Sequence, residues 1–498
     1  MNTFMNQLES ATNFKTTENG AVAHKSTRSA VYDMFALGGA YRSRSIEDCI
    51  LLFKNAIEEN EKLALKCLFY LRDCRGGQGE RRFFRVCYQW LIQTHPEIAK
   101  RNLVNISEFG RWDDLIYIGM DSKLKNETVK IVKNQLALDL ECKTPSLLAK
   151  WMPSENASAL ETKRMAKELR KAIGVNSKEY RVILSTLRRR INVLERLMSA
   201  GEWDKIEFDK IPSKAGLKYK NAFARRDIIA KKYEAFAKDE NTKVNASVLN
   251  PVDVIGKVTS HYNWWGNLET NFTSIDRAII EKYWNNLPDY LNGADCSMMC
   301  VVDTSGSMIG KPMDAAIGLG MYCAERLSGP FKDNYISFSS KPQLIKIKGI
   351  DFVDKVNRIY STNLCENTNL SAVFDLLLSI AKHPDTKVED IPKTIVVISD
   401  MEIDSGTSTW RGGYQWTIST AETEMEKIRK RWAREGFELP KLVYWNVNAR
   451  YDTILDAGPN VSFVSGYSPV IFEQILTGKT GYDLMLDKLM SKRYEVIK

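Results

Sequence analysis

Five oxygen-bearing side chains in the C-terminal part of the chain have types and spacing that suit a cation. Asp303, Ser305 and Ser307 alternate in the segment that follows the apolar run MMCVV. Thr368 precedes an apolar helical segment, and Asp400 follows a second apolar run, TIVVIS. Carboxylate and hydroxyl oxygens are suitable ligands for a hard divalent cation, Mg²⁺ first, with Mn²⁺ or Ca²⁺ as alternatives. The sequence therefore predicts one metal site that contains these five residues.

Other interpretations of the same residues stay open or fail on spacing. Polar residues after strands can simply cap helices and make turns, with no ion bound. The segment 306–312 is one residue short of a P-loop and ends in Pro where Ser or Thr is required. The chain has only four His, and no G-x-S-x-G pattern surrounds Ser305 or Ser307, so nucleophilic hydrolysis is poorly supported. We expect a protein that is not an enzyme.

The elements that must position these residues are strands and helices in alternation. Short runs rich in β-branched and aromatic residues recur from residue 295 onward, and they read SMMCVVDTS, NYISFSS, KTIVVISDM, KLVYWNVN and VSFVSG. Two amphipathic segments, MDAAIGLGMYCAERL and LSAVFDLLLSIAKH, lie between them. This alternation predicts a doubly wound parallel sheet, in which ligands gather at the carboxyl ends of the strands. Asp303 and Asp400 are placed at two such ends.

The preceding part of the chain has the apolar spacing of helices. In IEDCILLFKNAIEENEKLALKCLFYLRD, apolar residues recur at three- and four-residue intervals, and similar segments continue to about residue 235. Paired helices with short turns suggest HEAT-like repeats. Residues 238–262 look like a connecting stretch. The fold class is therefore α + α/β, with a flexible N-terminus at 1–27, an α-helical HEAT-like domain at 28–294 and a Rossmann-like α/β domain at 295–498.

Composition excludes several other classes of protein. The chain has 498 residues, of which 44% are hydrophobic and 27% charged, which argues for two or more folded domains and against wholesale disorder. We find neither an apolar run long enough to span a membrane nor a secretory signal, so we expect a cytoplasmic protein. The nine Cys are scattered, which suits reduced and mostly buried thiols.

The positive charge is concentrated in one region. The net charge is +9, and residues 161–230 carry 18 Lys and Arg against 9 Asp and Glu. Such a cluster attracts a polyanion in a salt-sensitive way, although a charge run is more often a solvated helix face. The candidate RNA-binding residues are Lys163, Arg164, Lys167, Arg170, Arg188, Arg189, Arg190, Lys214, Lys218, Lys220, Arg225 and Arg226. Because neighbours on a helix are rotated by about 100°, the three consecutive arginines cannot all face one side.

The sequence motifs described above resemble those of two known protein families. The order Asp303-x-Ser305-x-Ser307, Thr368, Asp400 resembles the metal-ion-dependent adhesion site of von Willebrand factor A domains. In that family these positions surround one Mg²⁺, directly or through water. One coordination position is left for a carboxylate of a partner protein. The resemblance therefore implies a metal-binding adhesion module at residues 295–498.

The N-terminal part resembles the TROVE module of Ro ribonucleoproteins, and most closely its uncharacterised relatives that are fused to a von Willebrand A domain. The segments that carry this resemblance are LFYLRDCRGGQGERRFFR, FGRWDDLIYIG, LAKWMPS and YRVILSTLRRRINVLERLM, with LVYWNVN and VSGYSP near the C-terminus. By itself, RGGQGERR looks like a turn between helices, and FGRWDDL looks structural. The resemblance implies binding of small structured RNAs and of single-stranded RNA ends. A metal-dependent protein–protein interaction module without RNA binding is the alternative.

Overall fold

The computed structural model describes residues 4, 5, 8, 12–259, 272–294, 296–338, 341–362, 367–404, 422–456 and 458–498. The chain divides into two compact units that interleave along the sequence. The α/β unit contains Met1–Ala64 and Leu249–Met490, and the helical unit contains Leu65–Val248 and Ser491–Lys498. The α + α/β class predicted from the sequence is confirmed, but each unit takes residues from both sides of the predicted boundary at 294/295.

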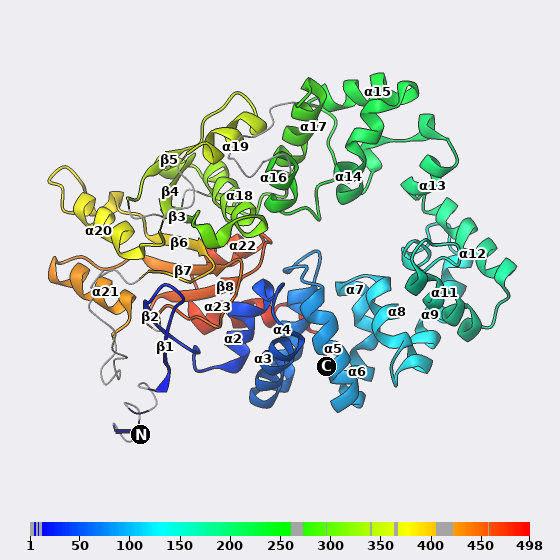
Figure 1. Ribbon diagram of the computed structural model, residues 1–498, viewed down its shortest axis with the longest axis horizontal. Helices are drawn as coiled ribbons and strands as arrows, with labels where there is room; N and C mark the ends of the chain where they lie inside the picture. Colours follow the sequence, from blue (N-terminus) through cyan, green and yellow to red (C-terminus); the bar gives the residue numbers. More distant parts are fainter. Residues whose placement is uncertain are drawn as a thin grey trace. The chain divides into compact units, whose positions relative to one another are not determined.

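A six-stranded sheet forms the centre of the α/β unit, in the order β5-β4-β3-β6-β7-β8 (Figure 1). The strands are β3 (Met298–Asp303), β4 (Asn334–Phe338), β5 (Leu344–Lys346), β6 (Thr394–Ser399), β7 (Lys441–Asn446) and β8 (Val461–Ser465). All neighbours are parallel except β5, which pairs antiparallel with β4. The chain order reverses between β3 and β6, so the carboxyl ends of these two strands form a topological switch point.

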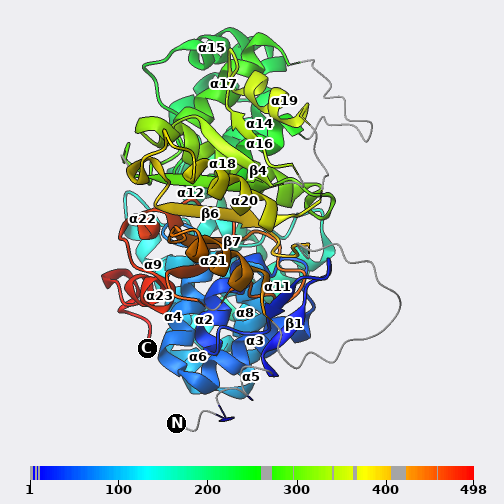
Figure 2. The same ribbon diagram turned by 90° about the vertical axis from the view of Figure 1, so that its left-hand side faces the viewer.

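Helices cover both faces of this sheet. As a consequence, every residue of β3 and β8 is buried, whichever face its side chain points to. The helices of the unit are α2 (Ala30–Leu37), α3 (Ile46–Glu59), α16 (Pro251–Thr259), α17 (Ser274–Asn285), α18 (Lys311–Arg326), α19 (Phe352–Tyr360), α20 (Leu370–Ala381), α21 (Glu424–Arg434), α22 (Ile471–Leu476) and α23 (Gly481–Leu489). Figure 2 shows α20 beside α21, where Phe374 meets Trp432 edge to face. Five predicted strands and two predicted helices are confirmed, and β5 was missed.

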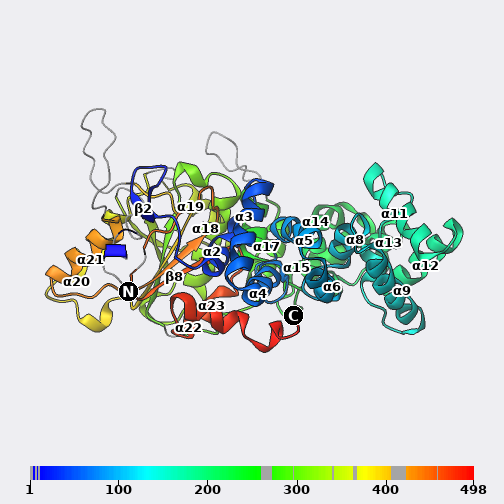
Figure 3. The same cartoon turned by 90° about the horizontal axis from the view of Figure 1, so that it is seen from below.

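The α/β unit also takes residues that the sequence assigned elsewhere. Residues 14–24 form a hairpin of β1 (Phe14–Thr16) and β2 (Val22–His24), so the prediction of a flexible segment over 1–27 is wrong here. The helix α2 packs on β8, where the Tyr32 hydroxyl accepts a hydrogen bond from the Phe463 amide at 2.8 Å (Figure 3). Within the predicted connecting stretch, α16 packs on α18. Burial of apolar side chains against the sheet, which composition does not reveal, decides these placements.

The helical unit consists of short helices joined by tight turns. They are α4 (Glu61–Arg72, whose first turn belongs to the α/β unit), α5 (Arg82–Thr94), α6 (Pro96–Asn102), α7 (Ile106–Phe109), α8 (Trp112–Met120), α9 (Lys125–Glu141), α10 (Leu148–Trp151), α11 (Leu160–Ile173), α12 (Ser177–Arg190), α13 (Leu194–Ser199), α14 (Ser213–Arg225) and α15 (Asp227–Lys238). Leu148, Leu169 and Tyr180 belong to an apolar core shared by α8 to α12. The helical class is confirmed, and HEAT-type repetition stays a prediction. No helix in the described ranges has both the length and the apolar character needed to cross a membrane.

The segment RGGQGERR is a turn between α4 and α5, as predicted. A Cβ atom on Gly77 would lie 2.0 Å from the Tyr70 carbonyl oxygen, so the backbone approach requires glycine. A Glu80 carboxylate oxygen accepts a hydrogen bond from the Arg82 amide at 3.1 Å at the start of α5. This segment therefore has a structural role.

Eight of the nine cysteines lie in the described residues, and all eight are free thiols. Cys49, Cys67, Cys87, Cys300 and Cys323 are buried. Cys365 lies outside the described residues. The expectation of reduced and mostly buried thiols agrees with these eight side chains.

Candidate metal centre and basic helical surface

Asp303, the last residue of β3, lies next to the carboxyl end of β6, because the two strands are parallel neighbours in the sheet. Val302 pairs with Ile398, which places Asp303 level with Ser399, the last residue of β6. The Ser399 hydroxyl donates to Asp303 Oδ2 at 2.5 Å, and the Ser305 amide donates to Asp303 Oδ1 at 2.9 Å. Asp303 and Ser399 are completely buried. The strand ladder therefore fixes the position of the first predicted ligand.

Two carboxylates share this buried edge. Burial raises the pKa of Asp303 above its usual range, the negative charge of Asp400 raises it further, and the hydrogen bonds from Ser399 and Ser305 offset part of the rise. Asp400 is completely buried as well. Two buried carboxylates close enough to repel each other favour a cation between them. This electrostatic conflict is the property that a metal ion would relieve.

The two serines of the same loop add hydroxyl oxygens. Ser305 Oγ and Ser307 Oγ lie 3.0 Å apart, and Ser305 caps the short 3₁₀ turn Gly306–Met308. Ser305 is thus held beside the Asp303 carboxylate, and the Ser307 hydroxyl is held beside that of Ser305. Four of the five predicted ligands, namely Asp303, Ser305, Ser307 and Asp400, therefore lie around the switch point.

Thr368 joins this group indirectly. Its hydroxyl oxygen lies 3.2 Å from the Glu402 carbonyl oxygen and 3.1 Å from Asp404 Oδ1. The Glu402 amide in turn donates to Asp400 Oδ1 at 3.2 Å. Thr368 is therefore held against the segment that follows Asp400, and its role as a ligand stays a prediction.

The sequence did not predict the residue that pairs with Asp400. Arg450 Nε donates to Asp400 Oδ2 at 3.2 Å, and the guanidinium also binds the Glu18 carboxylate. Arg450 follows β7 by four residues, so the strand-end rule that identified Asp303 and Asp400 would have placed it at the same edge. Ser399 was also missed, although it directly precedes Asp400.

The donor set fits a hard divalent cation. All four clustered donors are oxygens, and the two carboxylates would supply the charge that balances such an ion. In the part of the chain that the structure describes, no group of three His, Cys, Asp or Glu converges to hold a metal, so the hydroxyls would have to contribute. Asp303, Ser305, Ser307 and Asp400 are the residues that would hold the cation, which would supply Lewis acidity toward a carboxylate ligand.

The structure divides the predicted RNA-binding residues into two groups. The first group serves the fold. Arg188 donates from all three nitrogens, to the Ala149 and Met152 carbonyl oxygens and to the Ser154 hydroxyl, at 2.8 to 2.9 Å. The other members of this group are Arg164 with three acidic partners, Arg170 paired with Glu155, Arg190 bonded to the Leu140 carbonyl, and the buried Lys220. Arg188 is half-buried and uses all three guanidinium nitrogens within the fold, and Lys220 is buried, so an RNA contact by either of them stays a prediction that these contacts do not favour.

The second group remains on the surface. Its members are the exposed Lys167, Arg189, Lys214, Lys218, Arg225 and Arg226 and the half-buried Lys163. Arg226 stacks on the Trp203 ring at 4.9 Å. Three further exposed cations of α11 and α12, Lys171, Lys178 and Arg181, were missed, although the same basic composition marks their segment. Exposed cations are therefore present on α11, α12 and α14, and their set differs from the predicted one.

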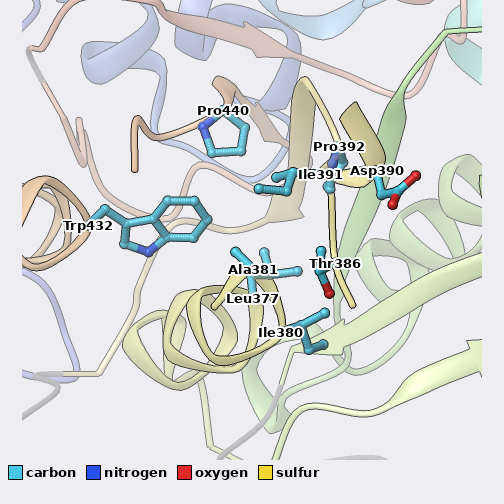
Figure 4. Close-up of a pocket in the computed structure, with 9 residues that line it drawn as sticks. All are labelled: Leu377, Ile380, Ala381, Thr386, Asp390, Ile391, Pro392, Trp432 and Pro440. Atoms are coloured by element: carbon cyan, nitrogen blue, oxygen red, sulfur yellow. The ribbon is translucent and has the colours of Figure 1, made fainter. Parts of the chain in front are cut away.

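One cavity in the described part of the α/β unit is lined by residues other than the candidate metal ligands. It has a volume of about 50 Å³ and lies between α20, α21 and the segments that lead into β6 and β7, with Leu377, Pro392, Trp432 and Pro440 in its wall (Figure 4). Its walls are mainly apolar, and its volume is comparable to that of one or two water molecules. We interpret this cavity as a small gap in the packing between helices and strands, and not as a ligand site.

The protein therefore has two units. The helical unit has helices with exposed cations, and the α/β unit has carboxylates and hydroxyls at the carboxyl ends of its central strands. The chain matches the family described as Domain of unknown function (DUF2828) over residues 17–141 and 129–294, more than half of its length, and it belongs to that family. Residues 297–493 match Domain of unknown function (DUF7788).

Two individual proteins are similar over most of the chain. Uncharacterized protein L728 of Acanthamoeba polyphaga mimivirus is 28% identical over 510 residues, which cover 94% of this chain and 85% of that protein. The crystal structure of the Deinococcus radiodurans Ro (RSR) protein aligns with 91% of this chain and 100% of its own, at 13% identity and a TM-score of 0.42.

Proposed function

We propose that this protein is a non-enzymatic RNA-binding scaffold of Ro type. In this proposal the helical unit binds RNA through exposed Lys and Arg, and the α/β unit is a von Willebrand A-like module. That module holds Mg²⁺, or Mn²⁺ or Ca²⁺, and offers it to a partner's carboxylate. The proposal is supported by the sequence resemblances and by the positions of the exposed cations.

The observation that carries RNA binding is a basic stripe on α14. Lys214, Lys218, Asn221 and Arg225 are all exposed and are spaced by four, three and four residues, which places them on one face of the helix. The sequence of α14 contains no Asp or Glu. A helix face that presents several exposed cations attracts a phosphate backbone, and no acidic residue within α14 itself offsets their charge.

The test reverses the charge of this stripe. We expect the triple variant Lys214→Glu, Lys218→Glu, Arg225→Glu to bind single-stranded poly(U) at least about tenfold more weakly in filter binding, because three phosphate contacts become repulsive. The control reverses three exposed lysines of the α/β unit, Lys346, Lys348 and Lys387. Equal affinities of the two variants would show that α14 does not bind RNA. A raised 260/280 nm absorbance ratio of the purified wild-type protein would independently indicate bound nucleic acid.

The adhesion-type cation site is supported by the sheet order, by the switch point and by the oxygen donors at it. We expect the full chain to bind Mn²⁺, measured by electron paramagnetic resonance of the free ion. Asp303→Asn keeps the size of the side chain and removes its charge. It should weaken binding by more than about tenfold, because even changes that only support a ligand cost about 10–100-fold. The exposed Asp385→Asn is the matched control, and equal weakening in both variants would exclude a specific site at Asp303.

A second candidate function is a metal-dependent protein–protein interaction module without RNA binding. The structural roles of Arg164, Arg170 and Arg188 favour it, because they reduce the predicted RNA-binding set. Under this alternative, the α14 variant would leave poly(U) affinity unchanged. Capture of a partner protein would still be lost on addition of EDTA or in Asp303→Asn.

A further inference from the structure

The N-terminal hairpin lies on the same strand edge as the candidate metal centre. Its β2 strand exchanges two backbone hydrogen bonds with Ile454, at 2.8 and 3.1 Å, in the segment that follows β7. Gly20 forms a bridge with Asp404 in the segment that follows β6. The hairpin is thus anchored to two segments that leave the carboxyl ends of neighbouring strands.

The turn of this hairpin, Thr17–Gly20, contacts the residues next to Asp400. The buried Thr17 hydroxyl donates to the Ile403 carbonyl oxygen at 2.7 Å. The Glu18 amide donates to the Glu402 carboxylate at 2.7 Å. Asn19 Nδ2 donates to the Glu402 carbonyl oxygen at 2.6 Å and to Thr368 Oγ1 at 3.1 Å. Consecutive residues of the turn therefore bind the 402–404 segment and a predicted metal ligand.

The turn also places a carboxylate near the site. The Glu18 side chain, which is 42% exposed, pairs with the Arg450 guanidinium, and the same guanidinium lies 3.2 Å from Asp400 Oδ2. One arginine thus separates an acidic side chain of the turn from a candidate metal ligand. A cation between Asp303 and Asp400 would take over the charge compensation that Arg450 provides here, and it would attract the Glu18 carboxylate to the same edge.

We propose that the turn Thr17–Gly20 is the chain's own occupant of the candidate cation site, with Glu18 as the carboxylate that the cation takes. This inference rests on the proposed cation site. It identifies the first partner of that site as a segment of the same chain. An acidic segment of another protein must displace the turn before it reaches the cation, and it would have to replace both the Glu18 carboxylate and the Asn19 amide contacts.

The experiment compares Mn²⁺ bound to the full-length wild-type chain and to Glu18→Gln. Water proton relaxation per bound Mn²⁺ reports how many water molecules remain on the ion. If Glu18 is a ligand, Glu18→Gln binds Mn²⁺ about tenfold more weakly and shows higher relaxation per bound ion, because water takes the vacated position. The matched control is Glu58→Gln, an exposed glutamate of α3 in the same unit, which should behave as wild type.

Two results would overturn the inference. Wild-type affinity and relaxation in Glu18→Gln would show that the turn does not reach the ion. Weaker binding with unchanged relaxation would show that Glu18 acts only through Arg450. Failure of the cation site itself is distinguishable, because in that case Asp303→Asn would also bind Mn²⁺ as the wild type does.

Discussion

At the scale of single residues, Asp114 is a buried carboxylate of the helical unit that pairs with three arginines. It is completely buried and accepts hydrogen bonds from Arg72, Arg81 and Arg85 at 2.6 to 3.0 Å. Burial alone would raise the pKa of this carboxyl. The charge of Arg72, the hydrogen bond from Arg81 and the charges of Arg85 and Arg81 outweigh burial and lower the pKa to about 2.

We predict that Asp114→Asn destabilises the helical unit by about 3–5 kcal/mol, because it leaves the buried Arg72 charge without its counter-ion. Asp113→Asn is the matched control. Asp113 is 25% exposed and pairs with more exposed arginines, so its loss should cost about 1 kcal/mol or less. Hydrogen exchange of peptides from α4 and α8 measures both effects. Equal protection in the two variants would contradict the buried-pair argument.

The same carboxyl predicts the direction of a pH effect. Its folded pKa is depressed below the unfolded value near 3.8, so its contribution to stability is complete above about pH 4 and is lost as the pH falls toward 2. The contribution is about 2 kcal/mol. The stability difference between wild type and Asp114→Asn, measured by urea unfolding, should therefore shrink as the pH is lowered through this window. A constant difference would argue against the depressed pKa.

Arg188 and Arg189 show how far sequence reasoning reaches at this scale. The helical rotation between neighbours predicts that they face different ways. The sequence does not reveal which one faces inward, because that depends on the carbonyl oxygens of Ala149 and Met152, some forty residues earlier. The positions of Asp303 and Asp400 at the strand ends were predictable from residue type and strand pattern, whereas the role of Asp303, Ser305, Ser307 and Asp400 as metal ligands stays a prediction. The strand-end rule would have placed Arg450 at this edge, but its pairing with Glu18 could not be predicted, since that pair joins segments more than four hundred residues apart.

At the scale of elements, the central strands were the most predictable feature. β3 is an apolar run that ends at Asp303, β6 is an apolar run that Asp400 follows directly, and burial on both faces makes their apolar pattern continuous. The hairpin β1–β2 was missed because three-residue strands give almost no periodic signal. Short β5 was missed for the same reason.

The basic stripe of α14 leads to a prediction about salt dependence. Each phosphate contact with single-stranded RNA contributes about 0.7 to the slope of log affinity against log salt concentration, because it releases a condensed counter-ion. The triple charge-reversal variant of α14 should therefore lower that slope by about 2. An unchanged slope with weaker binding would indicate that the variant disturbs the fold of the helical unit and does not remove phosphate contacts.

At the scale of the whole molecule, the two units do not follow the boundary that composition predicts. The α/β unit includes Met1–Ala64, and the helical unit includes Ser491–Lys498. The C-terminal segment belongs to the helical unit because Arg493 and Tyr494 both bind Asp73, and Tyr494 stacks on Phe109. Each of the two family matches, at 17–294 and 297–493, covers one continuous stretch of sequence, and each stretch contains residues of both structural units.

We predict that the fragment 295–498 does not fold alone. It lacks α2, whose Tyr32 and Phe35 are buried, and it lacks α16, which packs on α18. Exposure of these apolar surfaces should make the fragment aggregate or remain molten, with weak near-ultraviolet circular dichroism. A mixture with the fragment 1–294 should restore the spectrum of the full chain. A cooperative thermal transition of 295–498 by itself would refute the interleaved division.

The interleaving also sets an order of events during synthesis. The helix α2 leaves the ribosome more than four hundred residues before Ser465, whose hydroxyl donates to the Phe35 carbonyl oxygen. At translation rates of about 5–20 residues per second, α2 waits roughly 20–90 s for its sheet. The helical unit likewise waits for Arg493 and Tyr494, which bind Asp73. Each unit therefore completes its folding only after the last of its own segments has been synthesised, and its apolar surfaces stay uncovered until then.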